Sequence, residues 1–203
     1  MKQTLAITLM NLRAIPQRLG TSLVIVIGIA GVVAVLVSVL AMAVGFHKTV
    51  SNTGRPDRAL VLRGGSQAEI NSSLSREDAQ TVLDAPGIRR TADGKPIACG
   101  EAVTIISMKT IADDSDSNVT LRGTCDKLQA LRPELKIVAG RMFEPAVREL
   151  IVGVSAAKQF KNLQIGDEIE FRNSSWTVVG HFTTGGDNHE SELVGDIETV
   201  LSA

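Results

Sequence analysis

Gly94-Lys95 is the only Gly-Lys pair in the chain, and such a pair can mark a nucleotide site. A phosphate-binding loop has the form Gly-x-x-x-x-Gly-Lys-Ser/Thr, because its backbone amides cradle the phosphates and its hydroxyl binds Mg²⁺. Arg89 stands where the first glycine belongs, and Pro96 stands where the hydroxyl belongs. The chain therefore does not bind ATP through this motif.

The acidic stretch 113–117 is the second candidate for chemistry. Asp114, Asp116 and Asn118 match the first three ligand positions of an EF-hand calcium loop. Val119 stands where the sharp turn needs glycine, and Cys125 replaces the bidentate glutamate. The stretch is therefore interpreted as a solvated hairpin turn.

The three histidines, His47, His181 and His189, are too scattered to predict a zinc site, which normally has three protein ligands when it is catalytic. No Gly-x-Ser-x-Gly nucleophile elbow is present. We therefore predict no catalytic residue, no metal and no cofactor, and we expect that the protein is not an enzyme.

Cys99 and Cys125 are the only cysteines. They lie near the outer ends of two predicted strands, 97–108 and 119–122, which the acidic turn joins into a hairpin. In an oxidising compartment their Cα atoms could come within disulfide range. Otherwise the two cysteines are small buried residues.

The elements that carry these residues alternate between short strands and short helices, which predicts a mixed α+β domain. Ser75 followed by Asp78 is typical of a capped helix start, and Pro86-Gly87 ends that helix. The predicted strands cover 59–63, 97–108, 119–122, 135–138, 150–152, 167–171 and 176–179. The last two strands form a hairpin around residues 172–175. Helical turns are predicted at 155–160 and 196–203.

Charge is distributed unevenly along the chain. All 22 acidic residues follow residue 46, together with 18 of the 21 basic ones, so residues 47–203 carry a formal charge of −4. Binding to nucleic acid needs a basic face that neutralises phosphates, and aromatic platforms are scarce here as well. We therefore exclude a nucleic-acid partner.

Thr21 to Phe46 is an uncharged apolar run, long enough for a helix that crosses about 30 Å of hydrocarbon. The alternative is a cleaved signal peptide with a cleavage site near Ala41-Met42-Ala43, but the apolar run exceeds the usual length of such signals. The basic residues Lys2, Arg13 and Arg18 place the N-terminus in the cytoplasm.

Small residues recur along one face of this helix at spacings of three and four, namely Ala30, Ala34, Ser38, Ala41 and Gly45. Such a face allows other membrane helices to approach closely. The alternative is that small residues are simply common in membrane helices.

The chain thus divides into three parts: 1–20, 21–46 and 47–203. In the first part, Leu5, Leu9 and Leu12 have helical spacing before Pro16, which predicts a short amphipathic helix on the cytoplasmic surface. A frayed N-terminus is the alternative. The second part is the membrane helix, and residues 51–57 form the one linker-like passage before the remaining domain.

Several stretches together resemble the permease subunits of ABC transporters of the MacB and FtsX-like type. They are Asn11-Leu12-Arg13 with Pro16, Arg18 and Thr21-Ser22; residues 138–143 (VAGRMF) and 149–153 (ELIVG); and residues 163–169 (LQIGDEI) and 176–182 (WTVVGHF). Their order across residues 11–196 makes the resemblance specific.

The resemblance implies a bacterial inner-membrane permease whose residues 47–203 form an incomplete MacB-like periplasmic core domain. It also implies an ABC ATPase subunit, a second permease subunit in a dimer, membrane lipid and a periplasmic adaptor as partners. Family members continue through three further membrane helices, so we expect this chain to be a fragment or the product of a shortened gene.

The leading hypothesis is the N-terminal part of such a permease, which couples ATP hydrolysis elsewhere to extracytoplasmic movement. The main alternative is a single-pass membrane-anchored adaptor or assembly protein with a periplasmic partner. A membrane-bound hydrolase ranks third, because no catalytic motif is present. The substrate is not encoded in any recognisable motif.

Overall fold

The structure is a computed structural model that describes residues 3, 6–10 and 19–203. It divides into two compact units, Met1–Lys48 and Thr49–Ala203, which are described separately. In the N-terminal segment, residues 6–10 are helical and expose Ile7, Leu9 and Met10. Leu5 and Leu12 of the predicted amphipathic helix lie outside the described residues.

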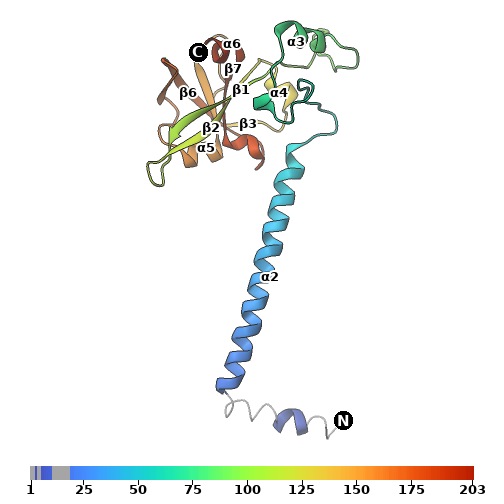
Figure 1. The fold of residues 1–203 in the computed structure, drawn as a ribbon, viewed down its shortest axis with the longest axis vertical. Coiled ribbons are helices and arrows are strands. Elements are labelled where there is room, and N and C mark those ends of the chain that lie inside the picture. The colour runs from blue at the N-terminus through green and yellow to red at the C-terminus, as the bar shows by residue number, and fades with distance from the viewer. Residues whose placement is uncertain (1–2, 4–5, 11–18) are drawn as a thin grey trace. The chain divides into compact units, whose positions relative to one another are not determined.

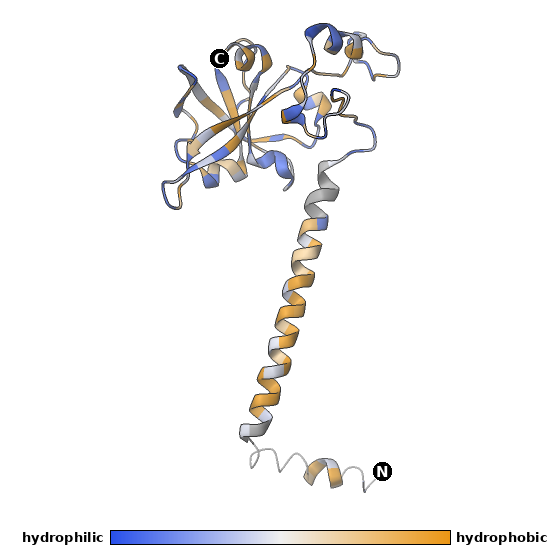
Figure 2. Cartoon of the chain, viewed as in Figure 1, coloured by the Kyte–Doolittle hydropathy of each residue, from blue (hydrophilic) through white to orange (hydrophobic). Residues whose placement is uncertain are grey.

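The long helix α2 spans Leu19–Thr53. Within it, Ser22–His47 is long and apolar enough to cross a membrane, with a mean hydropathy of 3.1, and Figure 2 shows this apolar stretch along most of the helix. The helix continues past Phe46 into the passage that we expected to be a linker from residue 51. It ends only where Gly54 and Pro56 remove the preference for helix, so the start of that linker was predicted too early.

The second unit is built on one mixed sheet (Figure 1). Its strand order is β1-β2-β7-β4-β6-β3, and β5 also pairs with β6. The strands are β1 (Ala102–Lys109), β2 (Asp116–Thr124), β3 (Lys136–Gly140), β4 (Glu149–Gly153), β5 (Glu168–Phe171), β6 (Ser174–Thr183) and β7 (Glu192–Asp196). The short helices are α4 (Leu128–Leu131), α5 (Val154–Gln159), η3 (Asn188–Ser191) and α6 (Ile197–Ser202).

Both predicted hairpins are present. β1 pairs antiparallel with β2 from Ala102 to Lys109. β5 pairs antiparallel with β6, and Phe171 lies opposite Ser174. Only Arg172 and Asn173, at φ 48° and 61°, form the second turn, because a tight two-residue turn places both residues in the left-handed region. The predicted four-residue loop 172–175 was therefore too long.

Each face of the sheet buries its own apolar cluster. Leu150 and Val152 of β4 point to a cluster around Trp176, whereas Ile151 points to a cluster around Phe182. This alternation follows from the two-residue period of a strand. Because both faces are covered, all five residues of β4 are buried.

Residues 54–100 precede the sheet, and we call them the connecting segment. They contain η2 (Glu69–Asn71) and α3 (Arg76–Leu83). The predicted cap is confirmed, because the Ser75 hydroxyl accepts a hydrogen bond from the Asp78 amide. The predicted strand 59–63 is wrong: it has no neighbouring strand, and the Arg63 amide instead donates to the Ser72 hydroxyl at 2.9 Å. The expected α+β class is confirmed.

Candidate functional site

Arg122 is a buried cation on β2, with a side chain that is only 4% exposed. Its Nε and Nη2 donate to the two carboxylate oxygens of Glu192 at 2.7 and 3.0 Å. Nη1 donates to Glu101 at 2.7 Å, and Nη2 lies 2.7 Å from a carboxylate oxygen of Glu69. The planar guanidinium suits this arrangement, since its donors match several carboxylates at once.

Two further residues, Arg132 and His189, complete the arrangement. Arg132, at the end of α4, contacts Glu101 at 3.3 Å and also meets the His189 ring. Because a guanidinium only donates, Nε2 of His189 accepts, and its Nδ1–H donates to Glu192 at 3.1 Å. We call these six residues the Arg122 cluster: Glu69, Glu101, Arg122, Arg132, His189 and Glu192.

The cluster keeps its central charges ionised. Burial alone would raise the pKa of Glu192, but hydrogen bonds from His189 and Arg122 and the attraction of Arg122 lower that pKa to about 2. Burial alone would lower the pKa of Arg122, whereas its contacts with Glu192 raise it above its ordinary value. A buried charge is tolerated only when it is paired in this way.

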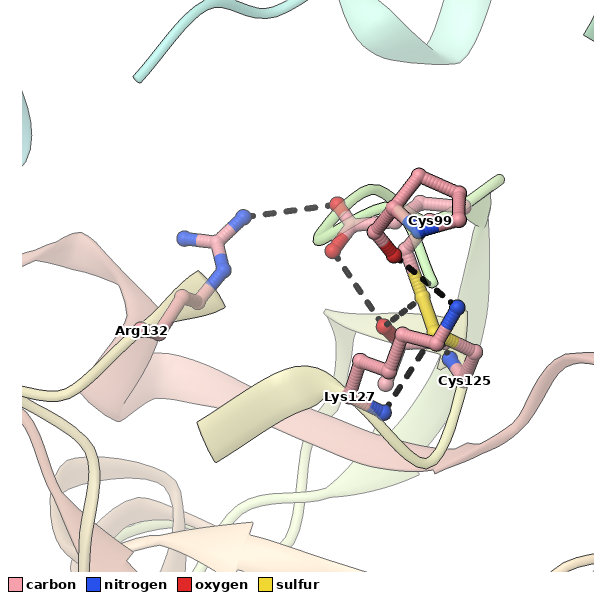
Figure 3. The surroundings of a disulfide bond; sticks show 7 residues. Cys99, Cys125, Lys127 and Arg132 are labelled. Atoms are coloured by element: carbon pink, nitrogen blue, oxygen red, sulfur yellow. Dashed lines mark hydrogen bonds and ion pairs between the residues drawn. A yellow bond between two sulfur atoms is a disulfide. The ribbon is translucent and has the colours of Figure 1, made fainter. Parts of the chain in front are cut away.

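The two cysteines lie beside this cluster and form a disulfide (Figure 3), with their Cα atoms 5.9 Å apart. Cys99 belongs to the connecting segment, and Cys125 follows β2. The Lys127 ammonium donates to the Pro96 carbonyl at 3.0 Å, which adds a second link between the same two stretches. Thr124 donates to Glu101 at 3.3 Å and so joins the disulfide region to the Arg122 cluster.

A third link lies near the start of the connecting segment. Arg58 forms an ion pair with Glu134 at 2.7 Å and donates to the Leu131 carbonyl at 3.1 Å. Arg55 approaches the same carboxylate at 3.7 Å. The connecting segment, which contains little regular structure, is therefore fastened to the rest of the second unit at residues 58, 69, 96 and 99.

Gly140 and Arg141 belong to the motif 138–143 of the family resemblance, and both make close contacts with other parts of the chain. A Cβ on Gly140 would lie 2.2 Å from the Val179 carbonyl, and Gly140 has φ +72°, so only glycine fits there. The next residue, Arg141, binds the Glu149 carboxylate with both terminal nitrogens. These contacts, first of all the hydrogen bonds from Arg141, lower the pKa of Glu149. The motif is therefore structural.

Glu190 fills a nest of backbone amides in the loop after β6. The amides of Thr184, Gly185 and Gly186 donate to one of its carboxylate oxygens at 2.9 to 3.0 Å, and the Thr183 hydroxyl donates to the same oxygen. Burial raises the pKa of Glu190, but these hydrogen bonds outweigh burial and lower it. The nest is thus occupied by the protein's own carboxylate.

Replacing Glu190 with alanine should lower the free energy of unfolding by about 1 to 3 kcal/mol, because the buried amide of Thr184 and the two glycine amides beside it lose their acceptor. Urea unfolding, followed by Trp176 fluorescence, measures this loss. The control is Glu144→Ala, which removes a 67% exposed carboxylate and should leave the unfolding midpoint unchanged. Equal midpoints for the two variants would contradict the role of the nest.

The predicted small-residue face of α2 is exposed along its whole length, from Ala30 to Gly45. The Ser38 hydroxyl donates to the Ala34 carbonyl at 2.8 Å and so does not project a free donor. A groove on a different side of the helix is lined by residues including Gly28, Gly31 and Val35. We did not predict this groove. The sequence signal for it is the pair of glycines, because a residue without a side chain leaves a depression on the helix surface.

The acidic turn uses its own carboxylates in local contacts. Asp113 accepts from Thr110 and Ser115, whereas Asp114 pairs with Lys161 at 2.9 Å. Among the described residues, no three His, Cys, Asp or Glu side chains gather as metal ligands would.

The chain has detectable similarity to solved structures. Among solved structures, the periplasmic region of MacB from Actinobacillus actinomycetemcomitans is 18% identical, with a TM-score of 0.47, over 70% of this chain and 65% of that one. The extracellular domain of a noncanonic ABC-type transporter, YknZ, from Gram-positive bacteria is 17% identical, with a TM-score of 0.46, over 64% of this chain and 66% of that one. This chain thus spans about two thirds of the length of these two structures.

No curated protein matches the chain. The family model described as the MacB-like periplasmic core domain, by contrast, matches residues 19–200, which include both α2 and nearly all of the second unit. The match therefore covers most of the 203 residues, and the chain belongs to the family of the MacB-like periplasmic core domain.

Proposed function

We propose that this chain is the N-terminal part of a permease subunit of an ABC transporter. In this proposal α2 crosses the bacterial inner membrane once, residues 1–20 lie in the cytoplasm, and residues 47–203 form the periplasmic domain. The observation that carries the proposal is the family match, which extends over residues 19–200 and so includes both the apolar helix and the sheet domain.

The proposed role is to couple ATP hydrolysis by a separate ATPase subunit to movement outside the cytoplasm. The connecting segment follows α2 directly in the chain and is tied to the sheet by Arg58–Glu134, by Glu69–Arg122 and by the disulfide. A displacement of the helix end would therefore reach the sheet through several links, and packed elements move as units rather than deforming continuously.

Cross-linking of the tagged full chain in bacterial membranes, followed by mass spectrometry, tests this proposal. We expect an ATPase subunit with a phosphate-binding loop, together with polypeptide that contributes further membrane helices. A periplasmic protein recovered without any ATPase would instead support a single-pass membrane-anchored adaptor or assembly protein, and would contradict the proposed permease.

Substitutions on the small-residue face separate the same two alternatives. The double variant Ala34→Leu and Ser38→Leu should reduce recovery of the partner helices several-fold, because bulky side chains keep membrane helices apart. Val33→Leu and Val44→Leu form the matched control, since they add methylenes about a quarter turn away. Unchanged recovery in both double variants would mean that this face meets lipid only.

A further inference from the structure

Two edge strands of the sheet line the same cavity. β1 is hydrogen-bonded as a strand to β2 alone, and β5 to β6 alone, within the described part of the chain. A cavity of about 190 Å³ lies between them, lined by residues 106–109 of β1, by all of β5, and by Lys161 and Asn162. We call this cavity the β1–β5 slot.

The hydrogen-bonding phase of β1 directs backbone groups into the slot. The Thr110 amide donates to the Ser115 carbonyl at 3.0 Å, which fixes the bonded pairs of this antiparallel ladder at every second residue. Ile105 and Ser107 therefore point their N–H and C=O groups away from β2. Lys109 follows the same alternation: its carbonyl also points away from β2 and accepts a hydrogen bond from the Lys161 amide at the end of the slot.

The same reasoning applies to β5. The Val178 amide donates to the Asp167 carbonyl at 2.9 Å, and the Gly166 amide donates to the Val178 carbonyl at 2.8 Å. Alternation along the ladder then leaves Glu168 and Glu170 with their N–H and C=O groups directed away from β6. Each wall of the slot thus offers a row of backbone donors and acceptors.

The side chains around the slot repeat with a period of two. Ile106 and Met108 of β1 and Ile169 of β5 are inward-facing apolar residues, and Phe171 stacks on Trp176 with ring centroids 5.0 Å apart. Ser107 and Lys109 of β1 and Glu168 and Glu170 of β5 alternate with them and form a polar rim. The Arg172 side chain reaches Thr104 at 3.5 Å at the opposite end from Lys161.

We propose that the β1–β5 slot binds an extended segment of a partner protein, which adds to these edges as a β-strand. An extended polypeptide matches both features of the slot: its backbone pairs with the exposed edge groups, and alternate apolar side chains reach the floor. A compact apolar molecule would fill the floor but leave the edge groups unpaired. This proposal does not depend on coupling to an ATPase.

The test uses the full chain in detergent micelles and a blocked pentapeptide of sequence Thr-Val-Thr-Val-Thr. Trp176 is the only tryptophan and stacks on Phe171 of the slot, so its emission should change saturably, with half-saturation below about 1 mM. Hydrogen exchange should slow by at least about tenfold at the Ser107 and Glu170 amides when the peptide is saturating.

Two controls separate strand addition from other outcomes. Ser107→Pro removes one edge donor and should abolish binding, whereas Ser107→Ala keeps that donor and should bind as the wild type does. A pentapeptide with N-methyl groups on alternate residues should not bind. If the proline variant does not fold, the hydrogen-exchange measurement on the wild type still shows whether the peptide pairs with the edge strands.

Three results would overturn the proposal. The first is a change in Trp176 emission without protection of either edge amide, which would indicate an apolar cavity only. The second is protection that appears in the protein alone together with a dimer mass, which would assign the edge to a second copy. The third is the absence of any response up to about 1 mM peptide.

Discussion

The substitution Arg122→Ala should lower the free energy of unfolding by about 3 to 5 kcal/mol. Arg122 is 4% exposed and bridges Glu192, Glu101 and Glu69. Without the guanidinium, these carboxylates remain inside the fold with no cation of comparable reach. Removing one partner of a buried ion pair is costly because the remaining charge is both desolvated and unpaired.

Urea unfolding of the full chain in detergent measures this effect, with Trp176 as the fluorescent reporter because it is fully buried and unique. The control is Arg76→Ala, which removes an ion pair with Glu198 whose side chains are 76% and 59% exposed. Solvent screens such a pair, so its loss should leave the midpoint unchanged. Similar midpoints for both variants would show that the Arg122 cluster contributes nothing to stability.

Acid should weaken the wild type through the same cluster. The pKa of Glu192 falls to about 2 in the folded protein from a reference value of 4.5. Folding therefore favours the ionised form, so this contribution is complete above pH 4.5 and is lost as the pH falls from 4.5 towards 2. In Arg122→Ala this part of the acid dependence should be reduced, and unfolding midpoints measured across that pH range test the difference.

The double substitution Cys99→Ser and Cys125→Ser should cost about 3.5 kcal/mol of unfolding free energy, by the chain-entropy estimate for a closed loop of this length. The disulfide spans 26 residues of sequence and joins the connecting segment to the end of β2. Without the cross-link the unfolded chain has more conformational entropy, which lowers the free energy of unfolding. The connecting segment then keeps only its non-covalent links, which include the ion pairs of Glu69 and Arg58 and the hydrogen bond from Lys127 to Pro96.

Unfolding with and without a dithiol reductant checks this prediction. Reductant should shift the wild type towards the double serine variant and should leave that variant unchanged. Mass spectrometry after thiol alkylation should find no free thiol in the oxidised wild type. Two alkylated cysteines in protein purified from an oxidising compartment, or a wild type that ignores the reductant, would contradict the disulfide.

Local patterns predicted a large share of the fold. The Ser75 cap, both hairpins and the long apolar helix arise from residues close together in sequence, so their signals survive without knowledge of the rest of the chain. The sequence left a Cys99–Cys125 disulfide as one of two alternatives, because the two cysteines lie beside the outer ends of one predicted hairpin. The phase of the strands and the positions of the turns were less exact, as the short turn at Arg172 and Asn173 illustrates.

Non-local pairing explains the failures. Residues 59–63 have the composition of a strand, but no neighbour offers them a ladder, and β-propensity is a preference for a packed surface rather than a property of the backbone alone. β7 was missed for the opposite reason. Its five residues include Glu192, Gly195 and Asp196, yet it lies between β2 and β4 and is entirely buried.

The sequence by itself determined that the chain has one apolar helix followed by an α+β domain, because hydropathy and periodicity are written in consecutive residues. Only the tertiary structure decided that Glu69, Glu101, Arg122 and Glu192 meet, since these residues come from four separate stretches and carry no shared motif. The same holds for the β1–β5 slot, because β1 and β5 lie at opposite edges of the strand order and meet only when the sheet curls back on itself. Contacts between distant residues depend on how the whole chain closes, and no local pattern encodes that closure.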